Sequence, residues 1–318
     1  MALDLRPLTL GELLDRSFTL YRRHFWLFVG LMALPSVFIL MLTVGSELVK
    51  RMVRGQGQAF AANPAAIAAV FIGGGLVFLV VFSAYMVAYM VALGATTLAV
   101  SEIYAGRTAT IAGSYSRMRG QVGRLILVML LVGLRLMGIF AGSILAVTLI
   151  AAVAGLVIGG RAGSVIGGVS FGLGMIAAVI GSLIFSLRYA LSVPSLVLEG
   201  VTAGESIRRS VALTRGNLGR TVVLVVFATI ITYVGLFILQ GPFSIAALVV
   251  GPDSGLALGL TMMGALSGAA GGAITGPLMI VALAVLYYDI RIRKEGLDLQ
   301  LMLASLDQDK AALEHVAV

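Results

Sequence analysis

Six long apolar runs dominate this chain and constrain its fold more than any other feature. A helix of about 20 residues, at a rise of about 1.5 Å each, spans the ~30 Å hydrocarbon core of a bilayer. Only 11% of the 318 residues are charged, against about a quarter in a typical soluble domain. Soluble globular, disordered and coiled-coil classes are therefore excluded, and an all-α integral membrane protein with six transmembrane helices is predicted. The runs cover residues 25–45, 66–100, 122–158, 163–193, 219–250 and 256–288.

Polar or helix-breaking residues separate the runs. Breaks are expected at residues 47–64, at Arg161 and at residues 251–253, and the Gly-rich stretch around Arg161 is the weakest boundary. The opening segment, MALDLRPLTLGELLDRS, is mixed and polar, so the first run is expected to be a retained helix and not a cleaved signal peptide. Pro35 and Pro277 lie inside runs and are expected to kink their helices.

The positions of Lys and Arg predict how the helices are oriented. With six spans, 17 basic residues fall on the side that holds both termini, and four fall on the other side. Basic loops stay in the cytoplasm, so both termini are expected to be cytoplasmic in the inner membrane of a bacterium. This distribution also accounts for most of the net charge of +8, so no nucleic-acid partner is inferred. The four exceptions are Lys50, Arg51, Arg54 and Arg161.

An internal repeat divides the chain into three similar parts. TLGELLDRSFTLYR from Thr9 matches TAGESIRRSVALTR from Thr202 at seven of 14 positions, with an offset of 193. IAGSYSRMRGQVGR from Ile111 matches IRRSVALTRGNLGR from Ile207 at six of 14, with an offset of 96. The sequence therefore predicts parallel repeats, each an interfacial amphipathic helix followed by two spans. The units are about 8–104, 105–200 and 201–297, forming one membrane domain of residues 1–297 followed by a cytoplasmic tail of residues 298–318.

The repeated helix has the pattern of an interfacial helix. Thr9-x-x-Glu12 and Thr202-x-x-Glu205 are capping boxes, and Glu12–Arg16 and Glu205–Arg209 are favourable i, i+4 pairs. The middle copy lacks both features, so its helix, around residues 109–119, is expected to be the shortest or the most mobile. Apolar residues recur on one face, which is expected to lie in the bilayer interface or against the spans. The predicted apolar positions are Leu14, Phe18, Tyr21; Ile111, Tyr115, Met118; and Ile207, Val211, Thr214.

The opposite, basic face of these helices is a candidate contact for anionic lipid headgroups. The alternative is a solvated face that only obeys the positive-inside rule. Gly120 and Gly216 are expected C-cap glycines, and Glu102, Glu199 and Glu295 end the units in register, 97 and 96 residues apart. The candidate headgroup contacts are Arg16, Arg22, Arg119, Arg209 and Arg215.

Glycines at a spacing of four are predicted to bring helices close together. The ladder in the last run consists of Gly264, Gly268, Gly272 and Gly276, and a bulky side chain there is expected to force helices apart. A ligand passage lined by glycine is the alternative. Similar pairs, Gly155/Gly159, Gly163/Gly167 and Gly168/Gly172, occur near the third–fourth connection.

Arg135 is the one charge well inside an apolar run. It has no equivalent in the other two units, where Phe38 and Ile231 occupy the matching positions. A charge at such a depth is expensive and is a functional hypothesis by default. It is a candidate contact for an anion or a lipid phosphate; the alternative is an arginine that reaches into a wet crevice or toward carbonyl oxygens.

Signatures of enzymes and of metal sites are absent from the sequence. There is no cysteine and only two histidines, and no HExxH, G-x-S-x-G or phosphate-loop motif occurs. No catalytic residue, cofactor or metal ligand is therefore assigned, and the protein is not expected to be an enzyme. Tyr287-Tyr288-Asp289-Ile290-Arg291 is interpreted as a membrane exit, with tyrosines at the headgroups and charges in water.

Three segments resemble a known family. LRPLTLGELLDRSFTLYRRHF at the start, PSLVLEGVTAGESIRRSVALTRGN from Pro194 and YYDIRIRKEGLDL from Tyr287 are similar to the bacterial glycerophosphoryl diester phosphodiesterase membrane-domain family. The resemblance implies a multi-span protein. Some members carry a soluble phosphodiesterase domain, which has no counterpart here, so the enzyme activity is not carried over.

Two functions are expected from these features. The first is a non-enzymatic accessory, scaffold or lipid-associated module of the cytoplasmic membrane, with membrane lipids as partners. The alternative is a transporter or lipid flippase with Arg135 on the path. A continuous polar cavity leading to Arg135 favours transport, and a dry bundle packed through glycine favours a scaffold.

Overall fold

The computed structural model describes residues 6–55, 64–251 and 254–296. It is 91% helical, and its described part contains no strand. Six helices are long and apolar enough to cross a membrane, which confirms the predicted class and the number of spans. The tail at 298–318 lies outside the described residues.

The chain divides into two compact units, and each is taken by itself. Unit 1 comprises the described parts of Met1–Val122 and Val223–Val318, and unit 2 is Gly123–Val222. Unit 1 contains α1 (Leu10–Arg23), α2 (Phe25–Gly55), α4 (Pro64–Tyr104), α5 (Ile111–Met118), most of α10 (Leu218–Val250) and α11 (Gly255–Glu295). Unit 2 contains most of α6 (Val122–Ile158), then α7 (Gly160–Tyr189), α8 (Ser192–Glu199) and α9 (Ala203–Thr214).

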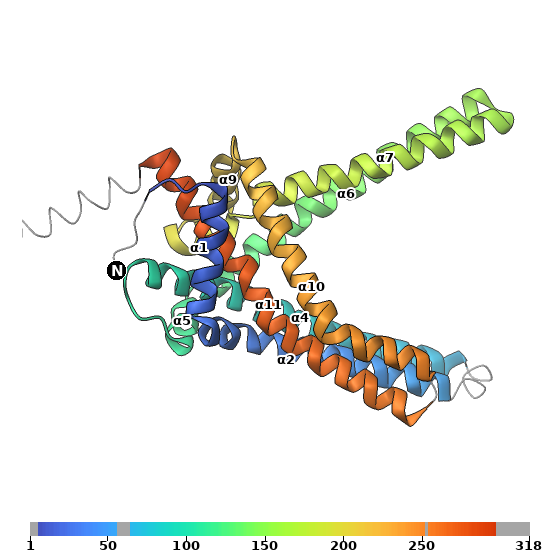
Figure 1. The fold of residues 1–318 in the computed structure, drawn as a ribbon. Coiled ribbons are helices and arrows are strands. Elements are labelled where there is room, and N and C mark those ends of the chain that lie inside the picture. Colours follow the sequence, from blue (N-terminus) through green and yellow to red (C-terminus); the bar gives the residue numbers. More distant parts are fainter. Residues whose placement is uncertain (1–5, 56–63, 252–253, 297–318) are drawn as a thin grey trace, which may run out of the picture. The chain divides into compact units, whose positions relative to one another are not determined.

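Helix α11 is the central helix of unit 1. It packs against α2, α4 and α1 (Figure 1), and 67% of its most apolar 18-residue window is buried, against 22% or less for the other spans. Small residues suit α11 to this position, because they let neighbouring backbones approach closely. A side chain at Gly235 of α10 would collide with Thr275, and one at Gly271 would press on Leu236 and Leu239.

Helices α6 and α7 of unit 2 form an antiparallel hairpin (Figure 1). Gly159 and Gly160 both have positive φ, 66° and 58°, which allows the tight reversal between the helices. The boundary that the sequence marked near Arg161 therefore lies two residues earlier, at Gly159. A Cβ on Gly163 would lie 2.7 Å from the Gly155 carbonyl oxygen, so glycine brings these two backbones together.

A short helix that was not predicted, α8, follows α7. Pro194 has no N–H to donate to the carbonyl of Ala190, so the helix is interrupted at Ala190–Leu191 and restarts at Ser192. Helix α8 ends at Glu199, and Gly200 caps it in the left-handed conformation (φ 68°). Gly296 caps α11 in the same way after Glu295 (φ 60°).

Candidate functional site

Three short helices, α1, α5 and α9, form from the repeated segments. α5 has 8 residues, against 14 in α1 and 12 in α9, so the prediction that the middle helix is the shortest is confirmed. Both predicted capping boxes are present, at Thr9/Glu12 and Thr202/Glu205. The C-cap prediction holds for Gly216 (φ 82°) and is wrong for Gly120, whose φ is not positive.

The face of α1 that packs against the protein differs in part from the predicted one. Leu13, Ser17, Leu20 and Tyr21 are buried, whereas Phe18 is 46% exposed. The prediction is confirmed for Tyr21, but Phe18 was predicted on the buried face in place of Ser17. Its hydroxyl donates to the Leu13 carbonyl at 2.7 Å, so the small side chain is satisfied locally and can be buried.

A buried carboxylate on α11 anchors the start of α1. Asp289 is 1% exposed, so the prediction that its charge lies in water is wrong. The Leu8 N–H donates to Asp289 Oδ1 at 2.8 Å, and Arg293 Nε donates to both carboxylate oxygens at 3.1 and 3.2 Å. Arg293 also donates to the Leu8 carbonyl. The last span therefore holds Leu8, two residues before the first short helix, through two charge-assisted contacts.

Carboxylates at the ends of α4, α8 and α11 form ion pairs with arginines. Glu102 of α4 binds Arg107 at 2.8 Å and also Arg117 of α5. Glu199 of α8 binds Arg209 of α9 at 2.9 Å. Two of the three carboxylates that end the repeat units, Glu102 and Glu199, thus bind an arginine of a short helix. In the third, Glu295 binds Arg291 within α11 itself.

The predicted ion pairs within the short helices are replaced by other contacts. Arg16 lies over the Tyr104 ring, 5.5 Å from its centroid, and Glu12 pairs with Arg6 at 2.6 Å. Arg209 turns to Glu199. These arginines therefore contact residues outside their own helices instead of forming the i, i+4 pairs, which stabilise a helix by only about 0.2–0.5 kcal/mol.

The structure divides the six candidate arginines into two kinds. Arg16 and Arg209 are half-buried and hold helices together. Arg22, Arg119, Arg135 and Arg215 are exposed. Among the described residues, the side chains of Arg22, Arg119 and Arg135 have no hydrogen-bond or ion-pair partner, whereas Arg215 does interact with another residue. Arg135 lies on α6 and lines none of the cavities described below.

The capping carboxylates have depressed pKa values. The Thr9 backbone N–H and the Arg6 guanidinium bind Glu12 and lower its pKa from 4.5 to about 2. Contacts with Thr202 lower the pKa of Glu205 as well. A depressed folded-state pKa stabilises the helix start above pH 4.5, and this contribution is lost as the pH falls toward 2. Burial raises the pKa of Tyr21 and of Tyr115 to about 12, so both hydroxyls stay protonated and can donate.

Two tyrosines of the short helices bind backbone carbonyls of long helices, which the sequence analysis missed. Tyr115 Oη of α5 donates to the Leu31 carbonyl of α2 at 2.6 Å. Pro35, four residues later, has no N–H for this carbonyl, so the tyrosine replaces the missing donor. Tyr21 Oη of α1 donates to the Ile274 carbonyl, three residues before Pro277. The sequence feature that could have predicted these contacts is a proline inside a span together with a tyrosine on an amphipathic helix.

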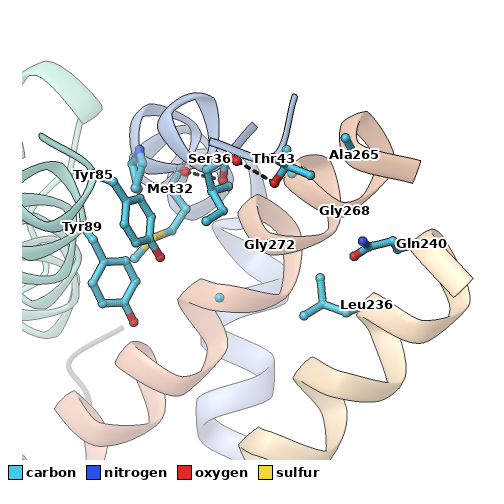
Figure 2. Close-up of a pocket in the computed structure, with 14 residues that line it drawn as sticks. Met32, Ser36, Thr43, Tyr85, Tyr89, Leu236, Gln240, Ala265, Gly268 and Gly272 are labelled. Carbon is cyan, nitrogen blue, oxygen red and sulfur yellow. Dashed lines mark hydrogen bonds between the residues drawn. The ribbon is translucent and has the colours of Figure 1, made fainter. Parts of the chain in front are cut away.

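A cavity of about 310 Å³ opens among α2, α4, α10 and α11 of unit 1. Figure 2 shows Gln240 of α10 pointing toward α11 at Gly268, with Tyr85 and Tyr89 of α4 on the opposite side. Ser36 and Thr43 line it but donate to the carbonyls of Met32 and Ile39 on their own helix. Among the described residues, the Gln240 amide has no hydrogen-bond partner. The cavity therefore combines an apolar wall with an unsatisfied polar group.

The four glycines of the ladder, Gly264, Gly268, Gly272 and Gly276, do not all have the same surroundings. A Cβ at Gly264 would lie 3.4 Å from Phe243 Cβ, and one at Gly268 would lie 2.7 Å from Gln240 Oε1. At Gly272 and Gly276 it would meet nothing within 4 Å, and both line the cavity. The packing prediction is wrong for these two, because they face the cavity, whereas the neighbouring Gly271 and Thr275 face α10.

A second cavity, of about 370 Å³, lies along α1. It is lined by three cationic side chains, Arg6, Arg16 and Arg23, and by the carboxylates of Glu12 and Asp15. Among the described residues, no three His, Asp or Glu side chains are grouped so that they could hold a metal ion.

No protein-family model, no curated protein and no solved structure matches this chain.

Proposed function

We propose that this chain is a non-enzymatic multi-pass protein of a bacterial cytoplasmic membrane, in which short helices bind anionic lipid headgroups. It acts as a lipid-associated accessory or scaffold module. Its likeness to the glycerophosphoryl diester phosphodiesterase membrane-domain family is part of this proposal and adds no activity. Both termini are cytoplasmic, in line with the distribution of 17 basic residues on one side and four on the other.

One observation carries the proposal: Arg22 and Arg119, exposed at the ends of docked helices, have no carboxylate partner in the part of the chain that the structure describes. Glu102 and Glu199 are taken by Arg117 and Arg209, whereas Arg22 and Arg119 are exposed and have no partner among the described residues. A basic side chain near an anionic bilayer surface gains about 1 kcal/mol. The exposed Phe18 adds an apolar contact with the interface.

The threefold repeat belongs to the same proposal. It is supported by equivalent serines, Ser17, Ser114 and Ser210, each of which is buried where its short helix docks. Ser210 accepts from the Leu191 N–H at 3.1 Å and donates to the Arg188 carbonyl at 2.7 Å. A small residue at this position lets the helix approach its support closely.

Lipid retention tests the proposal. The full chain is purified from nanodiscs that contain phosphatidylcholine and phosphatidylglycerol, and the ratio of bound lipids is measured by mass spectrometry. The expected result is enrichment of phosphatidylglycerol, reduced several-fold in Arg22→Gln/Arg119→Gln. Arg161→Gln, which removes an exposed arginine elsewhere, is the control. No enrichment, or equal loss in both variants, contradicts headgroup binding.

Lipid or solute transport is the second candidate, and the cavity in Figure 2 favours it. The path does not need Arg135, which lines none of the described cavities. Reconstituted vesicles with fluorescent lipids test this function: protein-dependent movement of lipid between leaflets supports it, and movement equal to empty vesicles rejects it.

A further inference from the structure

A polar cavity adjoins the one in Figure 2. It has a volume of about 340 Å³ and lies in unit 1 between the C-terminal part of α2, the end of α10 and the start of α11. Both cavities are lined by Thr43, Gln240 and Ala265, so they meet at these residues. Each volume falls in the range of about 300–1,000 Å³ that is usual for ligand pockets.

Positive charge gathers on the α2 wall of this second cavity. Arg51 and Arg54 line it together with a single carboxylate, Glu47. Glu47 Oε1 is 3.7 Å from Arg51 Nε, too long for a hydrogen bond, and Glu47 Oε2 also faces Lys50 at 3.5 Å. One carboxylate is thus shared by two cations, and Arg54 has no partner among the described residues.

The Nε atom of Arg51 is buried and has no hydrogen-bond partner. A buried donor that has lost water without gaining an acceptor costs free energy. An anionic oxygen in the cavity would satisfy it, and a guanidinium is well shaped to bind phosphate through two parallel N–H groups. The dipole of α2 favours cations at its C-terminal end. This effect does not explain why the Nε atom of Arg51 is buried.

The adjoining cavity, shown in Figure 2, has a largely apolar lining. Met32, Pro35, Ile39 and Leu236 line it, together with Gly272 and Gly276 of α11, where a Cβ would meet nothing within 4 Å. The polar and apolar halves meet at Gln240, whose amide has no partner among the described residues.

We propose that the two cavities form one binding site for an anionic amphiphile from the membrane. Its phosphate head binds Arg51 and Arg54, and its acyl chain lies along α11 at Gly272 and Gly276. The site also accounts for the position of the charges: Lys50, Arg51 and Arg54 are three of the four basic residues on the side where basic residues are disfavoured. That last point rests on the proposed orientation, whereas the cavities and the buried Nε do not.

Native mass spectrometry of the full chain in a non-ionic detergent tests this site. The probes are lysophosphatidylglycerol, lysophosphatidylcholine and glycerol phosphate at equal concentration. The first is expected to form the most abundant 1:1 adduct, and glycerol phosphate, which lacks a chain, is expected to form none. Equal adducts with all three probes, or an adduct with glycerol phosphate alone, would overturn the proposal.

Matched variants locate the site. Arg51→Gln and Arg54→Gln are expected to reduce the lysophosphatidylglycerol adduct about tenfold, and Lys50→Gln, on the same turn but outside both cavities, is expected to leave it unchanged. Arg51→Lys, which keeps the charge, should restore part of it. Equal losses in Arg51→Gln and Lys50→Gln would mean a surface charge effect and not a site.

Filling the apolar half is an independent test. Gly272→Leu is expected to abolish the adduct without changing the unfolding midpoint, because a Cβ there meets nothing within 4 Å. Gly259→Leu, on the same helix, also in open space and outside both cavities, is the control. An unchanged adduct in Gly272→Leu would overturn the site. Arg22 and Arg119 line neither cavity, so Arg22→Gln/Arg119→Gln is expected to keep the lysophosphatidylglycerol adduct. The proposed function and this binding site can therefore fail independently of each other.

Discussion

Asp289 shows how a single residue couples the two ends of the chain. Its buried carboxylate accepts the Leu8 N–H and pairs with Arg293. Asp289→Asn keeps the shape but removes the charge, so we expect α1 to loosen and the free energy of unfolding to fall by about 1–3 kcal/mol. Denaturation in mixed micelles measures the loss, and the exposed Asp15→Asn is the control. Equal stability of the two variants would mean that Asp289 does not anchor α1.

Glycines with the same sequence spacing differ in what surrounds them. A Cβ at Gly163 would lie 2.7 Å from a backbone oxygen of α6, whereas one at Gly168 would meet nothing within 4 Å. Gly163→Ala is therefore expected to destabilise the α6–α7 hairpin by about 1–3 kcal/mol. Gly168→Ala should be neutral or stabilising by up to about 1 kcal/mol, because alanine favours helix. Unfolding of the two variants decides this; the same sign for both would contradict the packing.

At the scale of elements, two short helices bind long helices close to a proline. Tyr115 donates to the carbonyl that Pro35 leaves without a donor. Tyr115→Phe should cost about 1–3 kcal/mol of stability in the parent chain and clearly less in Pro35→Ala, where a backbone N–H is restored. The double-mutant cycle measures this difference, with the exposed Tyr233→Phe as the control. An equal penalty in both backgrounds would show that the hydroxyl does not replace the missing donor.

The middle short helix should also be the least stable of the three. Helix α5 has 8 residues and no capping box, although Thr110 Oγ1 still accepts the Gly113 N–H at 3.1 Å. We expect faster amide exchange in residues 111–118 than in 10–23 or 203–214, measured in lipid nanodiscs. Slower exchange in α5 would mean that its ion pair with Glu102 and its bond to Leu31 outweigh the missing cap.

The elements were largely predictable from sequence, and their contacts were not. Apolar length and capping pattern depend on neighbouring residues in the chain, so the six spans and both capping boxes could be read directly. The buried side of α1, the partner of Arg16 and the burial of Asp289 depend on residues far away in sequence. Gly272 could not be told from Gly268 for the same reason: Gln240 of α10 lies opposite Gly268, whereas nothing lies within 4 Å of a Cβ at Gly272.

At the scale of the whole molecule, headgroup binding depends on how the chain is oriented in the membrane. The exposed arginines of the short helices can bind anionic headgroups of the inner leaflet only if these helices lie on the cytoplasmic side. The charge asymmetry predicts this orientation, and the cavity at Arg51 then opens near the other face of the membrane.

Single-cysteine labelling tests this central claim most directly, because the chain contains no cysteine. Thr108→Cys reports on the side of the short helices, and Ala162→Cys and Gly255→Cys report on the opposite side; all three positions are exposed. In intact cells, a membrane-impermeant maleimide is expected to label positions 162 and 255, and to label position 108 only after the membrane is opened. Labelling of position 108 in intact cells, with 162 and 255 protected, would contradict the orientation and the proposal built on it.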